Sequence, residues 1–307
     1  MAPVLSRRLG MFHSRAARRE AIHGYLFIAP AVVGFLIWIA GPMLFSAWVS
    51  LTAWDLLSPP EFVGLSNYQA MVKDPLFWQS LKVTAVYTLI SVPLFQVLAF
   101  ALALLINVRV RGIAIFRTIY YLPSIVPVVA NAMLWAWVFN SDFGLLNAAL
   151  RAFGLPKILW LQDPAFALPA LITMSLWGVG GAMLIYLAGL QGVPQQLYEA
   201  AEIDGASHWR RFVHVTLPML SPVLFFNFLM GLIGALQTFT QGYIITNGGP
   251  QNATLFYALY LYRRAFTDFR MGYASALAWV LFAIVLAISV LIFRYLGKQV
   301  YYEDEGR

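Results

Sequence analysis

The chain contains no cysteine among its 307 residues. Disulfide bonds, thiolate zinc sites and thiol catalysis are therefore excluded. The four histidines, His13, His23, His208 and His214, lie outside the apolar runs, and their spacings match no zinc site. Charged residues are also scarce, at 11% of the chain, whereas about a quarter of the residues in a soluble domain are charged. This composition is not that of a soluble domain.

Two features that other functions require are missing as well. No G-x-x-x-x-G-K-[ST] motif occurs, so the chain has no P-loop with which to hold the phosphates of ATP. No Asp or Glu lies within the six long apolar segments described below, although proton-coupled transporters usually need a buried titratable group. The sequence therefore argues against nucleotide hydrolysis by this chain and against proton coupling.

Apolar residues are abundant instead. They make up 61% of the chain, and the mean hydropathy is +0.74. A helix needs about 20 apolar residues to cross the core of a bilayer. Six segments meet this requirement, at 25–49, 83–106, 119–139, 166–189, 219–239 and 273–296. We therefore predict an all-α, polytopic membrane protein with six transmembrane helices and about half a turn of irregular structure in each outer loop.

The basic residues are distributed unequally between the two sides of this predicted bundle. With the N-terminus inside, thirteen Lys and Arg residues fall on the cytoplasmic side and seven on the outer side. We expect cytoplasmic N- and C-termini, a basic tail at 1–23, a transmembrane domain at 24–297 and a C-terminal tail at 298–307. These flanking residues explain the net charge of +7, so we expect membrane lipid and no nucleic acid as a partner. We expect the first span to be retained, because its apolar run is too long for a signal peptide.

A polar island interrupts the apolar pattern between the fourth and fifth spans. Pro194 suits the first turn of a helix, and Gly205 can take the left-handed conformation that ends one, so a short helix is predicted at about 195–204. Ser207 is placed to cap a second short helix, and Leu217-Pro218 then marks the entry to the next span. The loop at 191–218 is therefore predicted to be a helix-turn-helix outside the bilayer.

This island also carries a resemblance to a known family. The run Glu199-Ala200-Ala201-Glu202-Ile203-Asp204-Gly205-Ala206, followed by Leu217-Pro218, resembles the EAA loop of bacterial ATP-binding-cassette importer permeases. Other runs resemble the carbohydrate branch of that family, namely Gly64-Leu65-Ser66-Asn67-Tyr68, Tyr120-Tyr121-Leu122-Pro123 and Asn247-Gly248-Gly249-Pro250. The last of these is expected to be a tight turn at the outer surface. Because the extra spans and inserted domain of the larger maltose permease subunit are missing, the chain is more similar to compact six-span permeases of lactose, trehalose or glycerol-3-phosphate importers.

The resemblance implies a pore subunit rather than an enzyme, in the bacterial cytoplasmic (inner) membrane. It implies a second, different permease subunit, two cytoplasmic ABC ATPase subunits and a periplasmic or lipid-anchored sugar-binding protein as partners. ATP and Mg would be bound by the partner ATPase, and this chain itself would hold no cofactor and no metal. The coupling to the ATPase is assigned by resemblance to Glu199, Ala200, Ala201, Asp204, Gly205, Ala206, Leu217 and Pro218.

Polar and small residues inside the spans indicate a substrate path. Polar side chains are costly in a membrane and tend to face the bundle interior or a water-filled route. Flat aromatic rings can stack on the C–H faces of sugars, and glycines leave room for a ring. The candidates for the path are Ser124, Asn131, Ser175, Trp177, Gly178, Gly231, Gln237 and Thr238. Hydrogen bonding between helices is the simpler explanation for any one polar residue, and close helix packing for the glycines.

Three functions therefore compete. A permease of an ATP-driven sugar importer explains the coupling loop and the missing P-loop. A secondary, ion-coupled transporter explains the spans, but usually shows repeated halves or an ion site, and neither is visible. A membrane-embedded enzyme needs paired acids, a histidine cluster or a nucleophile inside the spans, and none is found. The first function is the one that we expect.

Overall fold

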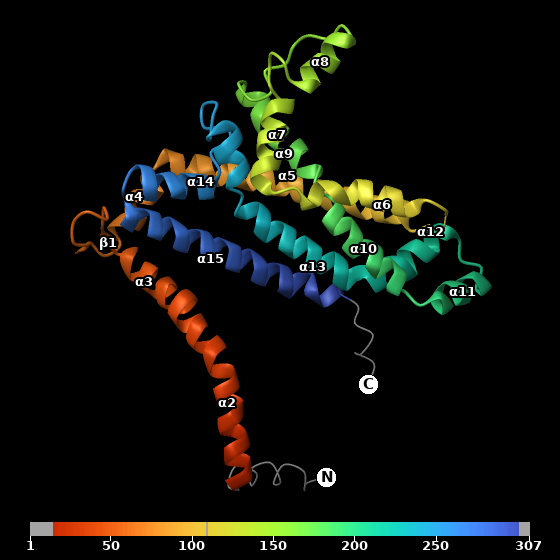
Figure 1. Ribbon diagram of the computed structural model, residues 1–307, viewed down its shortest axis with the longest axis horizontal. Helices are drawn as coiled ribbons and strands as arrows, with labels where there is room; N and C mark the ends of the chain where they lie inside the picture. Colours follow the sequence, from red (N-terminus) through yellow and green to blue (C-terminus); the bar gives the residue numbers. More distant parts are fainter. Residues whose placement is uncertain (1–14, 109, 301–307) are drawn as a thin grey trace.

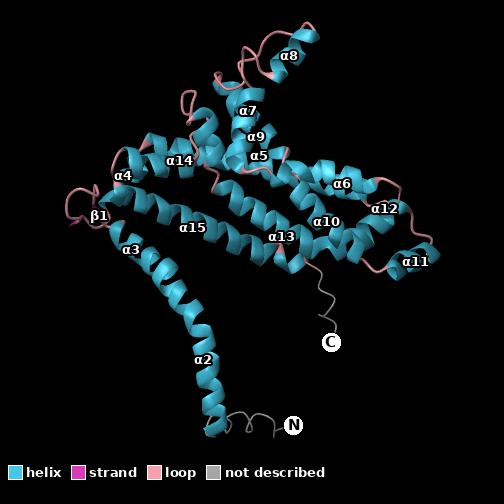
Figure 2. Cartoon of the chain, viewed as in Figure 1, coloured by secondary structure: helices cyan, strands magenta, loops and turns pink. Residues whose placement is uncertain are grey.

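The computed structural model describes residues 15–108 and 110–300, and this part of the chain is helical almost throughout (Figures 1 and 2). The first half contains α2 (Arg15–Phe35), α3 (Gly41–Val49), α4 (Ser66–Lys73), α5 (Pro75–Ile106), α6 (Ile113–Tyr121), α7 (Val128–Val138) and α8 (Leu145–Ala152). The second half contains α9 (Pro164–Leu176), α10 (Gly180–Gly192), α11 (Gln195–Ile203), α12 (His208–Arg211), α13 (Leu217–Leu236), α14 (Tyr257–Tyr262) and α15 (Met271–Tyr295). The strands β1 (Thr52–Ala53) and β2 (Glu61–Phe62) pair antiparallel, with Thr52 opposite Phe62.

The described residues supply membrane-length helices in the number that the sequence predicts, but two of the predicted spans are broken. Four continuous helices are long and apolar enough to cross a membrane: Arg18–Val49, Pro75–Ile106, His208–Leu236 and Met271–Tyr295. Two bent pairs pass the same test together: Ile113–Ile125 with Val128–Val138, bent by 98°, and Pro164–Leu176 with Gly180–Gly192, bent by 44°. If each bent pair is one span, the total is six by length and composition.

Prolines and glycines produce these breaks. A 3-10 turn at Leu122–Ile125 contains Pro123, and Val126 before Pro127 is extended, with φ −68° and ψ 128°, because a residue that precedes proline avoids the helical region. In the fourth span the break falls at Gly178. Gly180 then permits close packing, since a Cβ there would lie 2.1 Å from the main-chain oxygen of Tyr120. Helix packing therefore explains Gly180.

Helix α5 is the central element of the bundle. It packs against α9, α10, α13 and α14. One buried cluster lies where α5 meets α14, with the rings of Tyr87 and Phe256 edge to face at 5.0 Å and the N–H of Tyr257 donating to Thr84 Oγ1 at 2.8 Å. A second cluster lies where α5 meets α10 and α13, around Ala99 and Met183. These contacts bring polar groups of α5, α9 and α13 close together.

The first helix stands apart from this bundle. Its α3 part contacts α15 and β1, whereas α2 extends away from the rest of the described chain (the red helix in Figure 1). None of the residues in its most apolar stretch is buried. A π-helical segment, Leu36–Ala40, joins α2 to α3. The helix therefore presents apolar side chains on all of its faces, as a helix surrounded by lipid or by another membrane protein does.

The loops at the hairpin end of the bundle, where β1 and β2 lie, are more ordered than the sequence analysis expects. Asp74 caps α5 by accepting from the N–H of Leu76 at 2.9 Å, and it also accepts from the hydroxyls of Tyr260 and Tyr273. Arg264 completes the cluster with an ion pair to Asp74 at 3.2 Å. Burial raises the pKa of Asp74, but these hydrogen bonds and the nearby guanidinium outweigh it and lower the pKa. The first outer loop is therefore more regular than predicted, since it contains β1, β2 and α4, and Asp74 links it to residues far away in the sequence.

Candidate coupling loop and substrate path

The loop between the fourth and fifth spans begins with a short helix that ends as its sequence predicts. Helix α11 starts after Pro194, carries Glu199, Ala200 and Ala201, and ends at Ile203, with Asp204 at the C-cap. Gly205 has a φ of +76°. The N–H of Gly205 donates to Glu202 O at 3.0 Å, and the N–H of Ala206 donates to Ala201 O at 2.9 Å. These two bonds form a Schellman motif, in which the left-handed residue is usually glycine.

The second part of the loop differs from the prediction in one respect. Ser207 caps α12 as expected, with its hydroxyl accepting from the N–H of Arg210 at 3.4 Å. However, α12 does not end before the span. It continues through a π-helical segment, Phe212–Thr216, into α13, which begins at Leu217-Pro218, so that His208–Leu236 is one continuous helix. Pro218 lacks an N–H and was expected to open a new helix, but the wider π-helical turn before it accommodates the missing donor.

Side chains fix the angle between the two parts of the loop. Arg211 Nη1 contacts Glu202 Oε2 at 3.0 Å, and the hydroxyls of Tyr198 and Thr216 lie 3.0 Å apart. Within the part of the chain that the structure describes, no ion pair engages the exposed side chain of Glu199. Ile203 and Trp209 are exposed by 87% and 71%. The loop therefore offers a free carboxylate beside apolar side chains.

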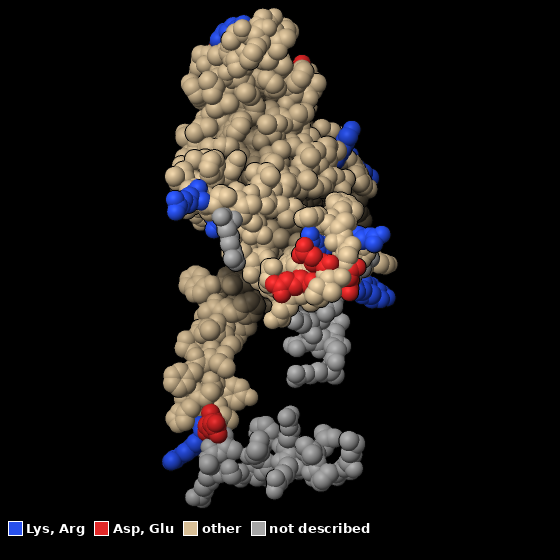
Figure 3. Space-filling model, turned by 90° about the vertical axis from the view of Figure 1, so that its right-hand side faces the viewer, with Lys and Arg blue, Asp and Glu red and all other residues tan. Residues whose placement is uncertain are grey.

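The charge on this end of the molecule is mixed. Figure 3 looks at the end that carries α11 and α12, and Asp and Glu side chains gather there with Lys and Arg beside them. The acidic side chains on the loop are Glu199, Glu202 and Asp204, and the basic ones are Arg210 and Arg211. An exposed surface that combines both charges with apolar groups is typical of a protein interface.

A second group of functional candidates surrounds a cavity inside the bundle. The cavity has a volume of about 210 Å³ and lies between α5, α9 and the end of α13. Four of its lining residues carry hydroxyl groups, namely Tyr87, Ser91, Ser175 and Thr238. The hydroxyl of Tyr87 interacts with those of the two serines and the threonine. Gly231 also lines the cavity. Hydroxyl groups that can donate and accept are suited to the hydroxyls of a neutral polar solute.

A hydrogen-bonded bridge borders the cavity. Gln96 lines it from α5, and its amide donates to the main-chain oxygen of Asn227 on α13 at 2.6 Å. Gln96 Oε1 accepts from the hydroxyl of Tyr186 on α10. The bridge holds three helices together beside the cavity. A Cβ on Gly231 would lie 3.0 Å from Gln96 Nε2, so a larger residue at position 231 would press on it.

The structure brings together only some of the residues assigned to the path. Ser175, Gly231 and Thr238 line the cavity, whereas Ser124, Asn131, Trp177, Gly178 and Gln237 are not in its lining. Gln237 is exposed beside Thr238, and the hydroxyl of Ser124 donates to the main-chain oxygen of Tyr121 at 2.7 Å. Trp177 lies edge to face with Trp135 at 6.0 Å.

Two of these neighbours have unsatisfied polar atoms. Asn131 Oδ1 and Trp135 Nε1 are buried without a hydrogen-bond partner in the described structure. They lie one turn apart on α7, so they mark a second polar patch within the bent third span. Sequence analysis missed Tyr87, Ser91 and Gln241 as lining residues of the cavity. The spacing of Tyr87 and Ser91, four residues apart on one face of a predicted span, is the signal that was available.

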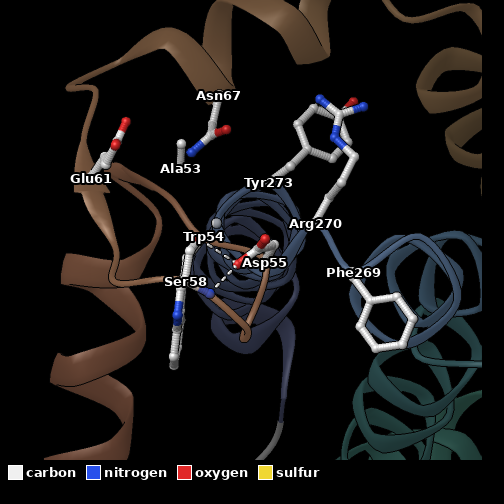
Figure 4. A pocket seen from close by; sticks show the side chains of 10 residues that line it. Ala53, Trp54, Asp55, Ser58, Glu61, Asn67, Phe269, Arg270 and Tyr273 are labelled. Atoms are coloured by element: carbon white, nitrogen blue, oxygen red, sulfur yellow. Dashed lines mark hydrogen bonds between the residues drawn. The ribbon is translucent and has the colours of Figure 1, made fainter.

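At the hairpin end, a pocket of about 360 Å³ lies between β1, β2 and the start of α15 (Figure 4). Asp55 lines it and is held by Ser58, whose N–H and hydroxyl donate to Oδ1 at 2.8 and 2.7 Å. These bonds, led by the Ser58 N–H, lower the pKa of Asp55. The Arg270 guanidinium lies over the ring of Tyr273, 4.9 Å from its centroid. Glu61 is exposed beside them, so this surface also carries both charges.

Comparison with known proteins places this arrangement in a family. Residues 96–300 match the family described as "Binding-protein-dependent transport system inner membrane component". The chain is 45% identical over 300 residues to the probable ABC transporter permease protein YesP of Bacillus subtilis, covering 96% of this chain and 97% of that one. It is 37% identical to the trehalose/maltose transport system permease protein MalF of Thermococcus litoralis, over 91% of this chain and 95% of that one.

Solved structures share the fold. A chain of a bacterial alginate ABC transporter, in complex with an alginate pentasaccharide-bound periplasmic protein, superposes with a TM-score of 0.80 at 22% identity, over 92% of this chain and 96% of that one. The chain belongs to the family of binding-protein-dependent transport system inner membrane components, the permeases of ABC transporters.

Proposed function

We propose that this chain is half of the membrane pore of an ATP-driven importer of a carbohydrate or related polyol. The observation that carries the proposal is the continuous helix His208–Leu236. The loop that would bind the ATPase subunit lies at the start of this helix. Thr238, which lines the hydroxyl-lined cavity, follows the end of the helix. The sugar class is supported by relatives such as the trehalose/maltose permease of Thermococcus litoralis.

The cavity supports a sugar-like solute more than a charged one. Its lining in the described structure is made of hydroxyl, amide and apolar groups. Apart from Arg294 near the end of the last segment, the six apolar segments contain no Arg or Lys to balance a phosphate. The volume of about 210 Å³ is below the ~300–1,000 Å³ of most small-molecule sites. A second, different permease subunit would supply the facing wall of the path.

Coupling is proposed to run through the loop at 191–218. Glu199 is free and exposed on α11, beside the exposed Ile203. An ATPase cleft with a basic residue would bind this combination, and the ATPase would supply ATP and Mg. With two permease subunits, two ATPase copies are needed to engage both loops. Because the ATPase is cytoplasmic, this proposal implies that the N- and C-termini are cytoplasmic and that the hairpin end lies outside.

The hairpin end would then receive the sugar-binding protein. The pocket in Figure 4 carries Glu61 and Arg270 on an exposed surface, next to a cluster that Asp74 holds in place. Opposite charges on a firm surface are suited to guiding a partner into one orientation.

Reconstitution of the complete assembly in liposomes tests the function. We expect ATP hydrolysis to rise when the sugar-loaded binding protein is added, and the sugar that gives the largest rise to be accumulated. A phosphorylated substrate as the best stimulator would contradict the proposed cavity chemistry. Uptake by this chain alone, without ATP, would instead indicate secondary transport, an alternative that the sequence relatives do not support.

The coupling loop is tested separately with a matched pair of variants. Glu199→Lys should abolish transport and stimulated ATP hydrolysis, because losing one member of a desolvated ion pair costs roughly 3–5 kcal/mol. Glu202→Gln should keep at least half of the activity, since Glu202 already pairs with Arg211 inside the loop. Membrane insertion of both variants is the control. Equal activity of the two would remove Glu199 from the mechanism.

A further inference from the structure

A cavity of about 1020 Å³ lies at the base of the coupling loop and has no role in the proposed transport. The end of α5, helix α6, the last turn of α10 and the start of α11 surround it. Asn107, Gln191, Gln195 and Tyr198 give it a polar lining. Among the described lining residues, Arg117 is the one charged side chain.

Arg117 is poorly satisfied for a residue of its kind. Its Nη2 donates to the main-chain oxygen of Ile106, at the end of α5, at 3.2 Å. Its Nε is buried and has no hydrogen-bond partner. Within residues 15–108 and 110–300, no carboxylate forms an ion pair with it. In the described structure this partly buried guanidinium therefore has an unpaired buried donor, which a bound anion would satisfy.

The neighbouring face of α6 indicates what kind of anion fits. Ile115, Phe116 and Ile119 on α6 are 65%, 56% and 58% exposed, and α6 belongs to a membrane-length bent pair. An exposed apolar face of α6 therefore lies beside a polar cavity that is lined by the Arg117 guanidinium. An amphipathic anion fits this combination, because its acyl chains can cover the apolar face and its phosphate can enter the cavity. Basic pockets at membrane boundaries commonly bind lipid headgroups.

We propose that this cavity binds the phosphate headgroup of an anionic phospholipid, with Arg117 as its principal ligand and the acyl chains along the exposed face of α6. A guanidinium is suited to phosphate because it offers several donors in one plane. The bound lipid would join the end of α5 to the start of α11, and so would steady the base of the coupling loop. The proposal does not depend on which solute is transported.

The test uses the purified full-length chain in nanodiscs of phosphatidylcholine, with and without phosphatidylglycerol, and native mass spectrometry counts the lipids that stay bound. We expect the wild-type chain to retain phosphatidylglycerol in preference to phosphatidylcholine. Arg117→Gln should weaken this retention at least about tenfold, because a charge-assisted hydrogen bond is lost. Arg111→Gln is the matched control, because Arg111 is exposed between α5 and α6 and does not line the cavity. This variant should change the retention of phosphatidylglycerol less than about twofold.

A second variant keeps the test valid if Arg117→Gln does not fold. Gln195→Glu places a carboxylate in the cavity and leaves Arg117 bonded to Ile106, and the first turn of α11 tolerates a negative charge. It should expel phosphatidylglycerol as Arg117→Gln does. Unchanged retention in Gln195→Glu would overturn the proposal. So would displacement of the lipid by inorganic phosphate, which would indicate a soluble anion, or by the ATPase subunits, which would indicate a protein carboxylate as the partner.

Discussion

The side-chain amide of Gln96 donates a hydrogen bond of 2.6 Å to the main-chain oxygen of Asn227, which ties α5 to α13 beside the hydroxyl-lined cavity. Tyr186 donates to the other end of the same amide. We expect Gln96→Leu and Tyr186→Phe to be coupled in a double-mutant cycle by about 0.6–1.7 kcal/mol, from the average to the largest value found for hydrogen bonds between membrane helices. Unfolding in mixed micelles measures the four free energies. Additive effects would show that the hydrogen bond between Gln96 and Tyr186 contributes nothing to stability.

The hydroxyls of the cavity are expected to contribute to transport. Thr238→Val and Ser175→Ala should each lower sugar uptake about two- to tenfold, because one neutral hydrogen bond to the solute is lost. Basal ATP hydrolysis should not change. Thr173→Val is the matched control, since Thr173 is exposed on α9 and its hydroxyl bonds its own helix at Pro169. Uptake that falls equally in the control would contradict a role for the cavity.

The turn after α11 is expected to accept only residues that tolerate positive φ. Gly205→Val should destabilise the loop by about 1–2 kcal/mol or more and impair coupling, because the left-handed conformation is unfavourable for a β-branched residue. Gly205→Asn should retain most activity, since asparagine adopts this conformation readily. Among the described residues, no neighbouring atom lies within 4 Å of a Cβ at this position, so the two variants differ in backbone preference rather than in packing. Stimulated ATP hydrolysis is the measurement.

Two glycines of the fourth span should respond differently to alanine. Gly180→Ala brings a Cβ within 2.1 Å of Tyr120 O, and the resulting separation of α6 and α10 should cost about 1–3 kcal/mol or more. Gly178→Ala meets only Ser175 O at 4.0 Å and should be close to neutral for stability. Thermal unfolding of the two purified variants in detergent compares them. The opposite order of stabilities would mean that the helices do not cross at Gly180.

The cluster around Asp74 should show a defined dependence on pH. Its pKa is lowered in the folded chain, so its stabilisation is complete above the unfolded value of about 3.9 and is lost as the pH falls through the folded value. Asp74→Asn should therefore lower the free energy of unfolding by about 1–3 kcal/mol between pH 5 and 8. The deficit should shrink below about pH 4. Asp268→Asn breaks the ion pair between Asp268 and Arg264, in which the Asp268 side chain is 38% exposed. It should therefore lower the free energy of unfolding by less than about 1 kcal/mol.

The accuracy of the sequence analysis depended on how local each signal was. The end of α11 just before the left-handed Gly205 and the cap at Ser207 were predicted correctly, because each depends on a few neighbouring residues. The continuity of α12 with α13 was not predicted, because a proline such as Pro218 usually stands in the first turn of a helix and a π-helical turn has no clear sequence signal. The 98° bend of the third span was not predicted either. Prolines mark where a helix breaks, but the angle depends on packing.

Long-range contacts were the least predictable. Tyr87 was overlooked because an isolated tyrosine in an apolar run resembles core packing, and two of the three hydroxyls that interact with its own, those of Ser175 and Thr238, come from distant parts of the chain. The link from Asp74 to Tyr260 and Tyr273 joins residues nearly 200 positions apart. No local pattern indicates such a link. Which members of the proposed path contact the solute stays a prediction.

The continuous helix from His208 to Leu236 also has a mechanical consequence. With 29 residues and a rise of about 1.5 Å per residue, it is about 44 Å long. A tilt of about 5° around its middle would move each end by about 2 Å in opposite directions. A displacement of the loop would therefore move the other end of the helix, next to Thr238, in the opposite direction, as in a lever. Force would then pass through the backbone of one helix, with no need for a relay of side chains.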